Sequence, residues 1–219
     1  MGLEILFEDK DIIVCYKPAG IATQTKNIGQ ADMESEVANY LSQKGEKPEV
    51  FVVHRLDQPV EGVMVFAKNQ KSAAVLSKQV TDRVFLKKYY AIITREAFPE
   101  AGELVDYLVK DNMTNLSKVV KESNPRAKKA VLKYKTVDEW DDKRLLDIEL
   151  HTGRHHQIRI QLASRTAPIL GDVKYGGVNT GRNLALCSHY IGFEHPTTKE
   201  KMEFSISPKG EDFLDSGVC

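Results

Sequence analysis

One carboxylate of this sequence stands where side chains often take part in catalysis. Asp57 follows a β-branched and aromatic run at residues 50–53, which predicts a strand, and it precedes Gln58 and Pro59. Its side chain is therefore expected at the junction of a strand and a loop, where catalytic groups are often displayed. An aspartate at such a junction more often forms a turn, so its position alone assigns no role.

Two other residues could add an aromatic face and a positive charge. Tyr89 belongs to a predicted strand at residues 84–93, on the face that also carries Phe85 and Ala91, so it could equally be a core tyrosine whose hydroxyl finds a partner. Arg159 follows His155 by one turn of a predicted helix, where a solvated helix face would explain it as well.

The elements expected to position these residues are mostly short strands. Strands are predicted at residues 3–7, 12–16, 50–53, 63–67, 84–93, 129–137, 144–150 and 201–206. Helices are predicted at residues 31–43, from an Asn69 cap to about residue 80, and at residues 155–163, and Ser207 is expected to cap a further helix that has Pro208 in its first turn. The pattern predicts an α+β fold, with a mixed, largely antiparallel central sheet flanked by helices in a single domain over residues 1–219.

Composition indicates a soluble globular protein. The chain has 219 residues, of which 42% are hydrophobic and 28% charged. No apolar run approaches the roughly 18 residues of a membrane helix, and Glu4 stands where a signal peptide would need a basic flank. The scattered cysteines Cys15, Cys187 and Cys219 argue against a disulfide framework and fit a reducing compartment. A cytoplasmic monomer is expected.

The formal net charge is zero, but the charges are segregated along the chain. Residues 151–171 contain no Asp or Glu, and residues 118–135 contain seven Lys or Arg against the single acid Glu122. Such stretches permit an anionic partner, although ordinary solvated surfaces can look the same.

The sequence predicts neither a metal nor an organic cofactor. His151, His155 and His156 are grouped, but thiols and carboxylates at ligand spacing are missing around them. No glycine-rich phosphate loop, no Gly-x-Ser-x-Gly elbow and no cysteine with a matching histidine is found.

Taken in order along the chain, several segments resemble the motifs of the RluA-type pseudouridine synthases. Residues 54–62, His-Arg-Leu-Asp-Gln-Pro-Val-Glu-Gly, resemble the family signature, and residues 6–9 with 14–20 resemble its N-terminal segment. Residues 87–91 (Lys-Lys-Tyr-Tyr-Ala) and 152–159 (Thr-Gly-Arg-His-His-Gln-Ile-Arg) match its second and third motifs, and residues 169–172, 175–176 and 193–196 resemble its C-terminal part. Val60-Glu61 and Cys187-Ser188 depart from the common pattern. The small N-terminal RNA-binding domain of many relatives is not expected here.

This resemblance implies the catalytic-domain fold of pseudouridine synthases and an isomerase that converts uridine to pseudouridine in structured rRNA or tRNA. Asp57 would be the nucleophile acting on a flipped-out base, and Arg159 would pair with Asp57 and lower its pKa. Tyr89 would lie against the base and assist proton removal from the ring. The isomerisation involves no redox change or energy input, which fits the absence of cofactor motifs.

The resemblance also implies a set of residues that bind RNA. His54 and Arg55 would hold phosphates or the loop, and Arg154 would act similarly from the opposite wall. Leu56, His156, Gln157 and Ile158 complete the expected substrate-binding set, and Lys87, Lys128 and Lys129 are expected at the RNA backbone.

Two other functions stay open at this stage. A catalytically silent RNA-binding protein of the same fold would be expected to have lost Asp57, Tyr89 or Arg159, and none is altered. A glycoside hydrolase would need a second acid facing Asp57, and the signature segment offers only Glu61 nearby.

Overall fold

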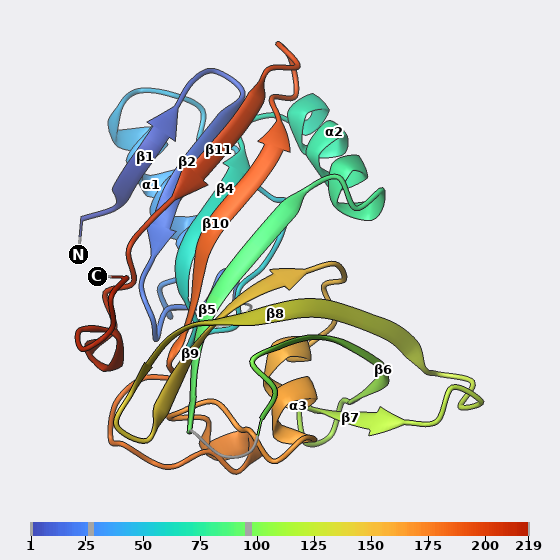
Figure 1. Cartoon of the computed structure of the whole chain (residues 1–219). Coiled ribbons are helices and arrows are strands. Elements are labelled where there is room, and N and C mark those ends of the chain that lie inside the picture. The colour runs from blue at the N-terminus through green and yellow to red at the C-terminus, as the bar shows by residue number, and fades with distance from the viewer. Residues whose placement is uncertain (1, 26–28, 95–97, 219) are drawn as a thin grey trace. The chain divides into compact units, whose positions relative to one another are not determined.

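The computed structural model describes residues 2–25, 29–94 and 98–218 of the chain. Its contacts divide the chain into two compact units (Figure 1). Unit 1 comprises Met1–Leu86 and Ser188–Ile206, and unit 2 comprises Lys87–Cys187 and Ser207–Cys219. The expectation of a single catalytic domain over the whole chain stays a prediction.

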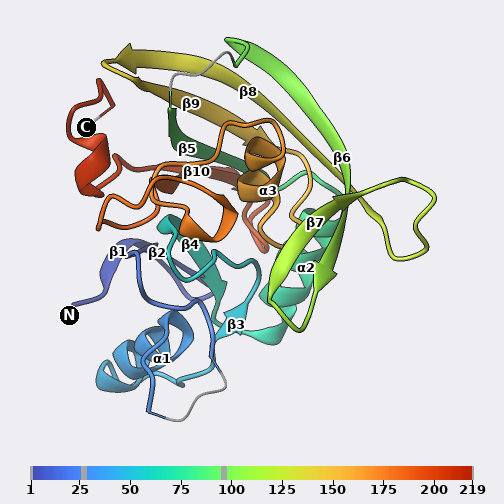
Figure 2. The same cartoon turned by 90° about the horizontal axis from the view of Figure 1, so that it is seen from below.

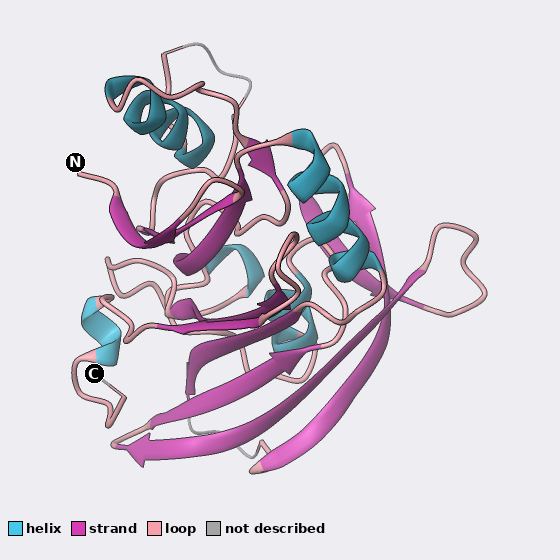
Figure 3. Cartoon of the chain, turned by 90° about the horizontal axis from the view of Figure 1, so that it is seen from above, coloured by secondary structure: helices cyan, strands magenta, loops and turns pink. Residues whose placement is uncertain are grey.

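Unit 1 is built on antiparallel strands with two helices. Strands β1 (Glu4–Glu8), β2 (Ile12–Lys17), β4 (Glu61–Ala67) and β10 (Leu186–Glu194) are neighbours in that order, while β3 (Phe51–Val52) pairs with β4 and β11 (Lys201–Ser205) pairs with β10. Helices α1 (Met33–Gln43) and α2 (Gln70–Thr81) are drawn in cyan in Figure 3. Their N-caps, Asp32 and Asn69, each accept a backbone N–H from the residue three positions later, as the Asn69 prediction required.

The core of unit 1 lies along its two central strands. Every residue of β2 and β4 is buried, which is why both segments, apart from the terminal Lys17 and Glu61, are hydrophobic without alternation. Phe85 and Phe193 stack in this core with ring centroids 5.4 Å apart. Strand β4, which begins with the last two residues of the signature segment (residues 54–62), is therefore held in a close-packed interior.

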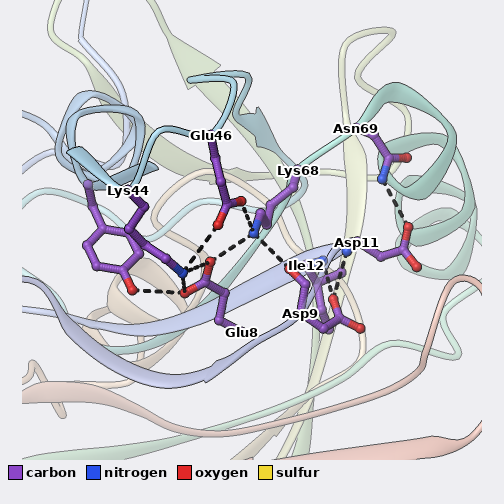
Figure 4. Close-up of polar contacts among 9 residues, drawn as sticks. Glu8, Asp9, Asp11, Ile12, Lys44, Glu46, Lys68 and Asn69 are labelled. Carbon is purple, nitrogen blue, oxygen red and sulfur yellow. Dashed lines mark hydrogen bonds and ion pairs between the residues drawn. The ribbon is translucent and has the colours of Figure 1, made fainter. Parts of the chain in front are cut away.

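A polar cluster at one end of unit 1 ties β1 to the chain after α1 (Figure 4). Lys68 Nζ lies 2.8 Å from Glu8 Oε1 and 2.7 Å from Glu46 Oε2, and Lys44 Nζ lies 2.9 Å from Glu8 Oε1. Burial raises the pKa of Glu8, but hydrogen bonds from Lys44, Lys68 and Tyr40 outweigh it and lower that pKa to about 2. The cluster therefore stabilises the fold while Glu8 is ionised.

The described residues of unit 2 form a curved antiparallel sheet with one α-helix (Figure 1). Its strand order is β5 (Leu86–Thr94), β9 (Lys143–Leu150), β8 (Lys128–Trp140), β6 (Ala101–Asp111) and β7 (Leu116–Val120). Helix α3 (Gln157–Ala163) packs against β6 and β7 (Figure 2). Two 3₁₀ turns, η1 (Val173–Tyr175) and η2 (Glu211–Phe213), complete the unit.

The α+β fold with a largely antiparallel sheet is confirmed, and so is the hairpin of β8 and β9. The helix predicted to start at Ser207 is wrong, because residues 206–210 form neither helix nor strand and only a single 3₁₀ turn, Glu211–Phe213, follows. Strands β6, β7 and β10 were not predicted as strands. Cys15 and Cys187 are buried thiols, and Cys219 lies outside the described residues.

None of the helices in the described ranges is both long enough and apolar enough to cross a membrane.

Candidate active site

In unit 1, the backbone on both sides of Asp57 is fixed by hydrogen bonds. Thr23 Oγ1 accepts the N–H of Leu56 at 3.1 Å and donates to the carbonyl of Leu56 at 2.9 Å. The N–H of Val60 donates to the carbonyl of Asp57 at 3.0 Å, which closes a turn. Leu56 and Val60 are buried and Asp57 is half-buried. The Asp57 side chain is therefore presented from a loop whose two ends are anchored in the core.

The segment after β2, residues 18–20, is hydrogen-bonded to this loop. The N–H of Gly20 donates to the carbonyl of Gln58 at 2.9 Å, and Gln58 Nε2 donates to the carbonyl of Gly20 at 3.0 Å. Gly20 has a φ of 90°, a left-handed conformation that glycine adopts without strain. The two segments that resemble separate family motifs thus form one hydrogen-bonded structure.

Lys17, the last residue of β2, is fully buried and has its ammonium group inside the Asp57 loop. Its Nζ donates to the carbonyls of Pro18 at 3.0 Å, Gln58 at 3.1 Å and Val60 at 2.6 Å. Burial lowers the pKa of Lys17 to about 8, although the negative charges of Asp57 and Glu61 raise it. Lys17 is thus a cation at neutral pH that holds the loop and interacts electrostatically with Asp57.

Sequence reasoning did not single out Lys17. The available signal was a lysine at the end of a strand that is otherwise wholly apolar, because a lysine at a buried position must find acceptors or a counter-charge.

The residues at which the signature segment departs from the family pattern have defined contacts. Glu61 is buried and accepts a hydrogen bond from Tyr16 Oη at 2.5 Å. Gly62 has a φ of 142°, and a Cβ placed on it would lie 2.5 Å from the carbonyl oxygen of Ser188. Only glycine therefore fits at residue 62, because β4 approaches the backbone at Ser188 too closely for a side chain.

The first two residues of the signature segment differ in their surroundings. His54 is buried, its Nε2 accepts the N–H of Val65 at 3.2 Å, and its ring centroid lies 5.2 Å from that of Phe85. Arg55 is exposed. His54 thus has contacts that hold the loop against the core, and the predicted contacts of both residues with RNA stay predictions.

In unit 2, Tyr89 is 6% exposed and lies on β5, opposite Ile148 of β9. Alternation along the strand places Lys87, Tyr89 and Ala91 on one face. The structure thus places the aromatic ring and the Lys87 side chain on the same side of the sheet, two residues apart.

The third motif forms a hydrogen-bonded turn between β9 and α3. Thr152 Oγ1 donates to Gln157 Oε1 at 2.7 Å and accepts the N–H of Val131 at 2.8 Å, while Gln157 Nε2 donates to the carbonyl of Val131 at 3.1 Å. Gln157 Oε1 also accepts the N–H of Arg154 at 3.1 Å. Gln157 and Ile158 are buried, so these expected substrate-binding residues build the turn that carries Arg154.

Arg159 has a buried carboxylate partner within unit 2. Its Nε donates to Asp172 Oδ2 at 2.8 Å and its Nη2 donates to Asp172 Oδ1 at 2.7 Å, a two-pronged pairing of side chains that are 4% and 0% exposed. Its guanidinium also lies 5.2 Å from the centroid of the Tyr175 ring. Sequence reasoning missed the role of Asp172, although it noted the segment at residues 169–172. The predicted pairing of Arg159 with Asp57 involves one residue from each unit and stays a prediction.

His156 is a neutral hydrogen-bonding residue next to Arg159. Burial lowers its pKa to about 3, and the positive charge of Arg159 contributes in the same direction. Its Nδ1 lies 2.8 Å from Tyr175 Oη, and its backbone has a φ of 52°, which starts α3 at Gln157 rather than at the predicted residue 155. A histidine that stays neutral serves here to orient neighbours rather than to carry charge.

One group of potential metal ligands occurs within residues 2–25, 29–94 and 98–218: Asp9, Asp11 and His195, with ligand atoms within 4.8 Å of one another. His195 Nδ1 accepts the N–H groups of Thr197 and Thr198, so a neutral ring carries its proton on Nε2, which lies 2.9 Å from Asp9 Oδ2. With both ring nitrogens engaged, this histidine has no lone pair to offer a metal. The group fits a structural role.

The comparisons with known proteins agree with this geometry. Residues 11–164, which include the Asp57 loop, Tyr89 and the turn before α3, match the family described as RNA pseudouridylate synthase. The chain belongs to this family, whose members are isomerases that act on RNA. The resemblance inferred from the ordered motifs is confirmed.

Relatives with curated names are similar over nearly the whole chain. The uncharacterized RNA pseudouridine synthase YhcT of Bacillus subtilis is 35% identical over 90% of this chain and 66% of its own length. Ribosomal large subunit pseudouridine synthase D of Vibrio cholerae is 30% identical over 98% of this chain and 70% of its own length. tRNA pseudouridine synthase C of Haemophilus ducreyi is 30% identical over 94% and 90%, respectively. The chain thus spans just under two thirds of YhcT.

The fold is found in a solved structure as well. The human protein named RNA Pseudouridylate Synthase Domain Containing 4 superposes with a TM-score of 0.77, covering 94% of this chain and 89% of that chain at 23% identity. At that identity the match establishes the fold, which is that of a pseudouridylate synthase domain.

Proposed function

We propose that this protein is an RNA pseudouridine synthase that isomerises uridine to pseudouridine in rRNA or tRNA, with Asp57 as the nucleophile. The observation that carries the proposal is the construction around Asp57. A half-buried carboxylate stands on a loop held at both ends by Thr23 and by the buried ammonium of Lys17. A fixed carboxylate beside a buried cation is suited to covalent chemistry, because it is oriented and its ionised form is favoured.

The reaction assigned to this site breaks the glycosidic bond from the ribose to a ring nitrogen and forms a bond from the ribose to a ring carbon. The proton of that carbon is lost and the freed nitrogen gains one, so substrate and product are isomers. Asp57 would add to the ring, attack the anomeric carbon or deprotonate the sugar. Tyr89 would contact the base and assist removal of the carbon-bound proton.

The charges of unit 2 support RNA as the partner. On β8, Lys133 is paired in register with an acid on each neighbouring strand, Glu103 of β6 and Glu149 of β9. At the start of the same strand, no carboxylate of the described residues lies within 4.0 Å of Lys128 or Lys129. The same holds for Lys121 and Arg126, which lie in the connection between β7 and β8. This connection extends from the sheet in Figures 1 and 3. Uncompensated cations on a projecting segment are suited to phosphate contacts.

The decisive test is pseudouridine formation by the wild type and by Asp57→Asn. Pseudouridine mapping of RNA from a strain lacking the gene identifies the substrate, and purified protein is then assayed on that RNA. Wild-type protein and Asp82→Asn, a change of an exposed aspartate in the same unit, are expected to form pseudouridine at the mapped position. Asp57→Asn should bind the RNA with unchanged affinity and form none. Turnover by Asp57→Asn at a tenth of the wild-type rate would remove Asp57 from the role of nucleophile.

The same assays separate the alternative functions. A silent RNA-binding protein would bind the RNA without forming pseudouridine, and a glycoside hydrolase would release free base or sugar. The structure disfavours the hydrolase, because the nearby acid Glu61 is buried and engaged by Tyr16 rather than placed to face a second carboxylate across a sugar.

A further inference from the structure

Two cations of unit 2 lie against the same turn between β9 and α3. The Nζ of Lys87 on β5 lies 3.4 Å from the position that a Cβ on Gly153 would occupy. The next residue, Arg154, has its Nε bound to the carbonyl of Lys129 at 2.9 Å and its N–H bound to Gln157 Oε1 at 3.1 Å. Strand β5 thus places the Lys87 ammonium at Gly153, and the adjacent residue of the same braced turn carries a second cation, Arg154.

Neither cation has a counter-charge in the protein. Among the described residues, no carboxylate lies within 4.0 Å of Lys87 or Arg154, and residues 151–171 contain no acid. Both side chains are half-buried. Burial lowers the pKa of Lys87, because its ammonium is partly removed from water. Partly desolvated cations that lack partners cost free energy, which an anionic ligand would recover.

We propose that Lys87 and Arg154 form a subsite for one phosphodiester group of the RNA. The proposal rests on the proposed function, whose substrate it places. The planar guanidinium donates two parallel hydrogen bonds to phosphate oxygens and lysine adds a compact charge. Because its Nε is held by the Lys129 carbonyl, Arg154 loses little further freedom on binding.

The position of Lys87 on β5 indicates which phosphate of the RNA the subsite would bind. Lys87 and Tyr89 point to the same side of β5, and alternate residues of a strand are about 6.6 Å apart. Tyr89 is the residue proposed to contact the reacting base. The subsite therefore holds the phosphate next to that base and fixes the backbone while the nucleotide leaves its stack.

The experiment measures RNA affinity against salt concentration for Lys87→Gln, Arg154→Gln and the double variant, with an RNA transcript that contains the mapped uridine. Lys133→Gln is the matched control, because Lys133 lies on the same sheet and is paired in register with the acids Glu103 and Glu149. Each single variant should lower the slope of log affinity against log salt by about 0.7 to 0.9, the value for one phosphate contact. Because both cations hold one phosphate, the double variant should lose no more slope than either single variant.

Two results would overturn the subsite. The slope could stay unchanged in both single variants, or the losses could add in the double variant to about 1.4–1.8, which would indicate two separate phosphates. Lys87→Arg keeps the positive charge and should keep the wild-type slope, so it tests the role of the charge if Lys87→Gln does not fold.

Pseudouridine formation by the wild type is measured separately. Binding with these slopes but without turnover would leave the subsite and reject the proposed function, whereas turnover with unchanged slopes would reject the subsite alone. Absence of any RNA binding by the wild type would reject both.

Discussion

Replacing Lys17 by methionine would separate the positioning of Asp57 from the stability of the fold. Methionine has a similar length and suits a buried site, but it donates no hydrogen bond. The change leaves the carbonyls of Pro18, Gln58 and Val60 without the donor that now joins them. It also removes the positive charge beside Asp57. The loop that carries the proposed nucleophile would thus lose its internal anchor.

Two opposing contributions keep the expected change in stability small. The carbonyls of Pro18 and Val60 would have no donor, which costs at least about 2 kcal/mol at about 1 kcal/mol each, whereas the carbonyl of Gln58 keeps the N–H of Gly20. Conversely, the fall in the Lys17 pKa from 10.5 to about 8 corresponds to about 3.4 kcal/mol for keeping this ammonium charged in the interior, and methionine removes that cost. The free energy of unfolding should therefore change by less than about 2 kcal/mol. The rate should fall far more, by about 10²-fold, because a catalytic group displaced by about 1 Å loses that much.

The assay compares kcat for pseudouridine formation and the free energy of unfolding in wild type, Lys17→Met and Lys44→Met. Lys44 is a lysine of the same unit whose side chain is 40% exposed, so its replacement should leave kcat unchanged. Wild-type kcat should also fall as pH rises past about 8, where Lys17 loses its proton, and Lys17→Met should lack this alkaline limb.

Loss of stability does not explain the expected fall of kcat above about pH 8. The pKa of Lys17 is lower in the folded than in the unfolded chain, so the unfolded chain binds more protons between pH 8 and 10.5 and stability from this group rises with pH. A folded Lys17→Met protein with kcat within threefold of the wild type would refute the positioning role.

Asp172→Asn should lower the free energy of unfolding by about 3–5 kcal/mol in a denaturant titration, because it removes the charge of the buried carboxylate that pairs with the guanidinium of Arg159; a loss below about 1 kcal/mol would mean that the pair is dispensable. Glu8 has its pKa lowered from 4.5 to about 2, so its stabilisation is complete above pH 4.5 and is lost as pH falls towards 2. Glu8→Gln should accordingly flatten the pH dependence of the melting temperature over that range, and an unaltered profile would contradict the assignment. Reversing Lys128 and Lys129 to glutamate should weaken RNA binding and flatten its salt dependence while kcat at saturating RNA is retained; an unchanged salt slope would indicate that these lysines only solvate the start of β8.

Local sequence determined much of this protein. The Asn69 cap predicts the start of α2, because capping depends on residues within one turn of each other. The hairpin of β8 and β9 could likewise be predicted from alternation and an acidic turn. Strand β6 could not, because the polar residues Glu103 and Asp106 interrupt its apolar alternation and only pairing with β8 identifies it as a strand.

The motif residues Asp57, Tyr89 and Arg159 were also accessible from sequence, because the chemistry of a family is encoded in residue types at fixed local spacing. What the sequence did not reveal is which residues hold them. Arg159 was expected to pair with Asp57, and within its own unit it is bound by Asp172. Gln157, which is expected to bind substrate, is hydrogen-bonded to Thr152 and Val131 and braces the turn, and its contact with substrate stays a prediction.

Lys17 shows why these assignments need the tertiary structure. Its three acceptors lie 1, 41 and 43 residues away in sequence. No local sequence pattern predicts the two distant contacts. The sequence by itself determined which groups could do the chemistry, since that depends on side-chain type. Only the tertiary structure decided which of them are buried, charged and oriented, because burial and hydrogen bonding arise from segments that meet in space after the chain has folded.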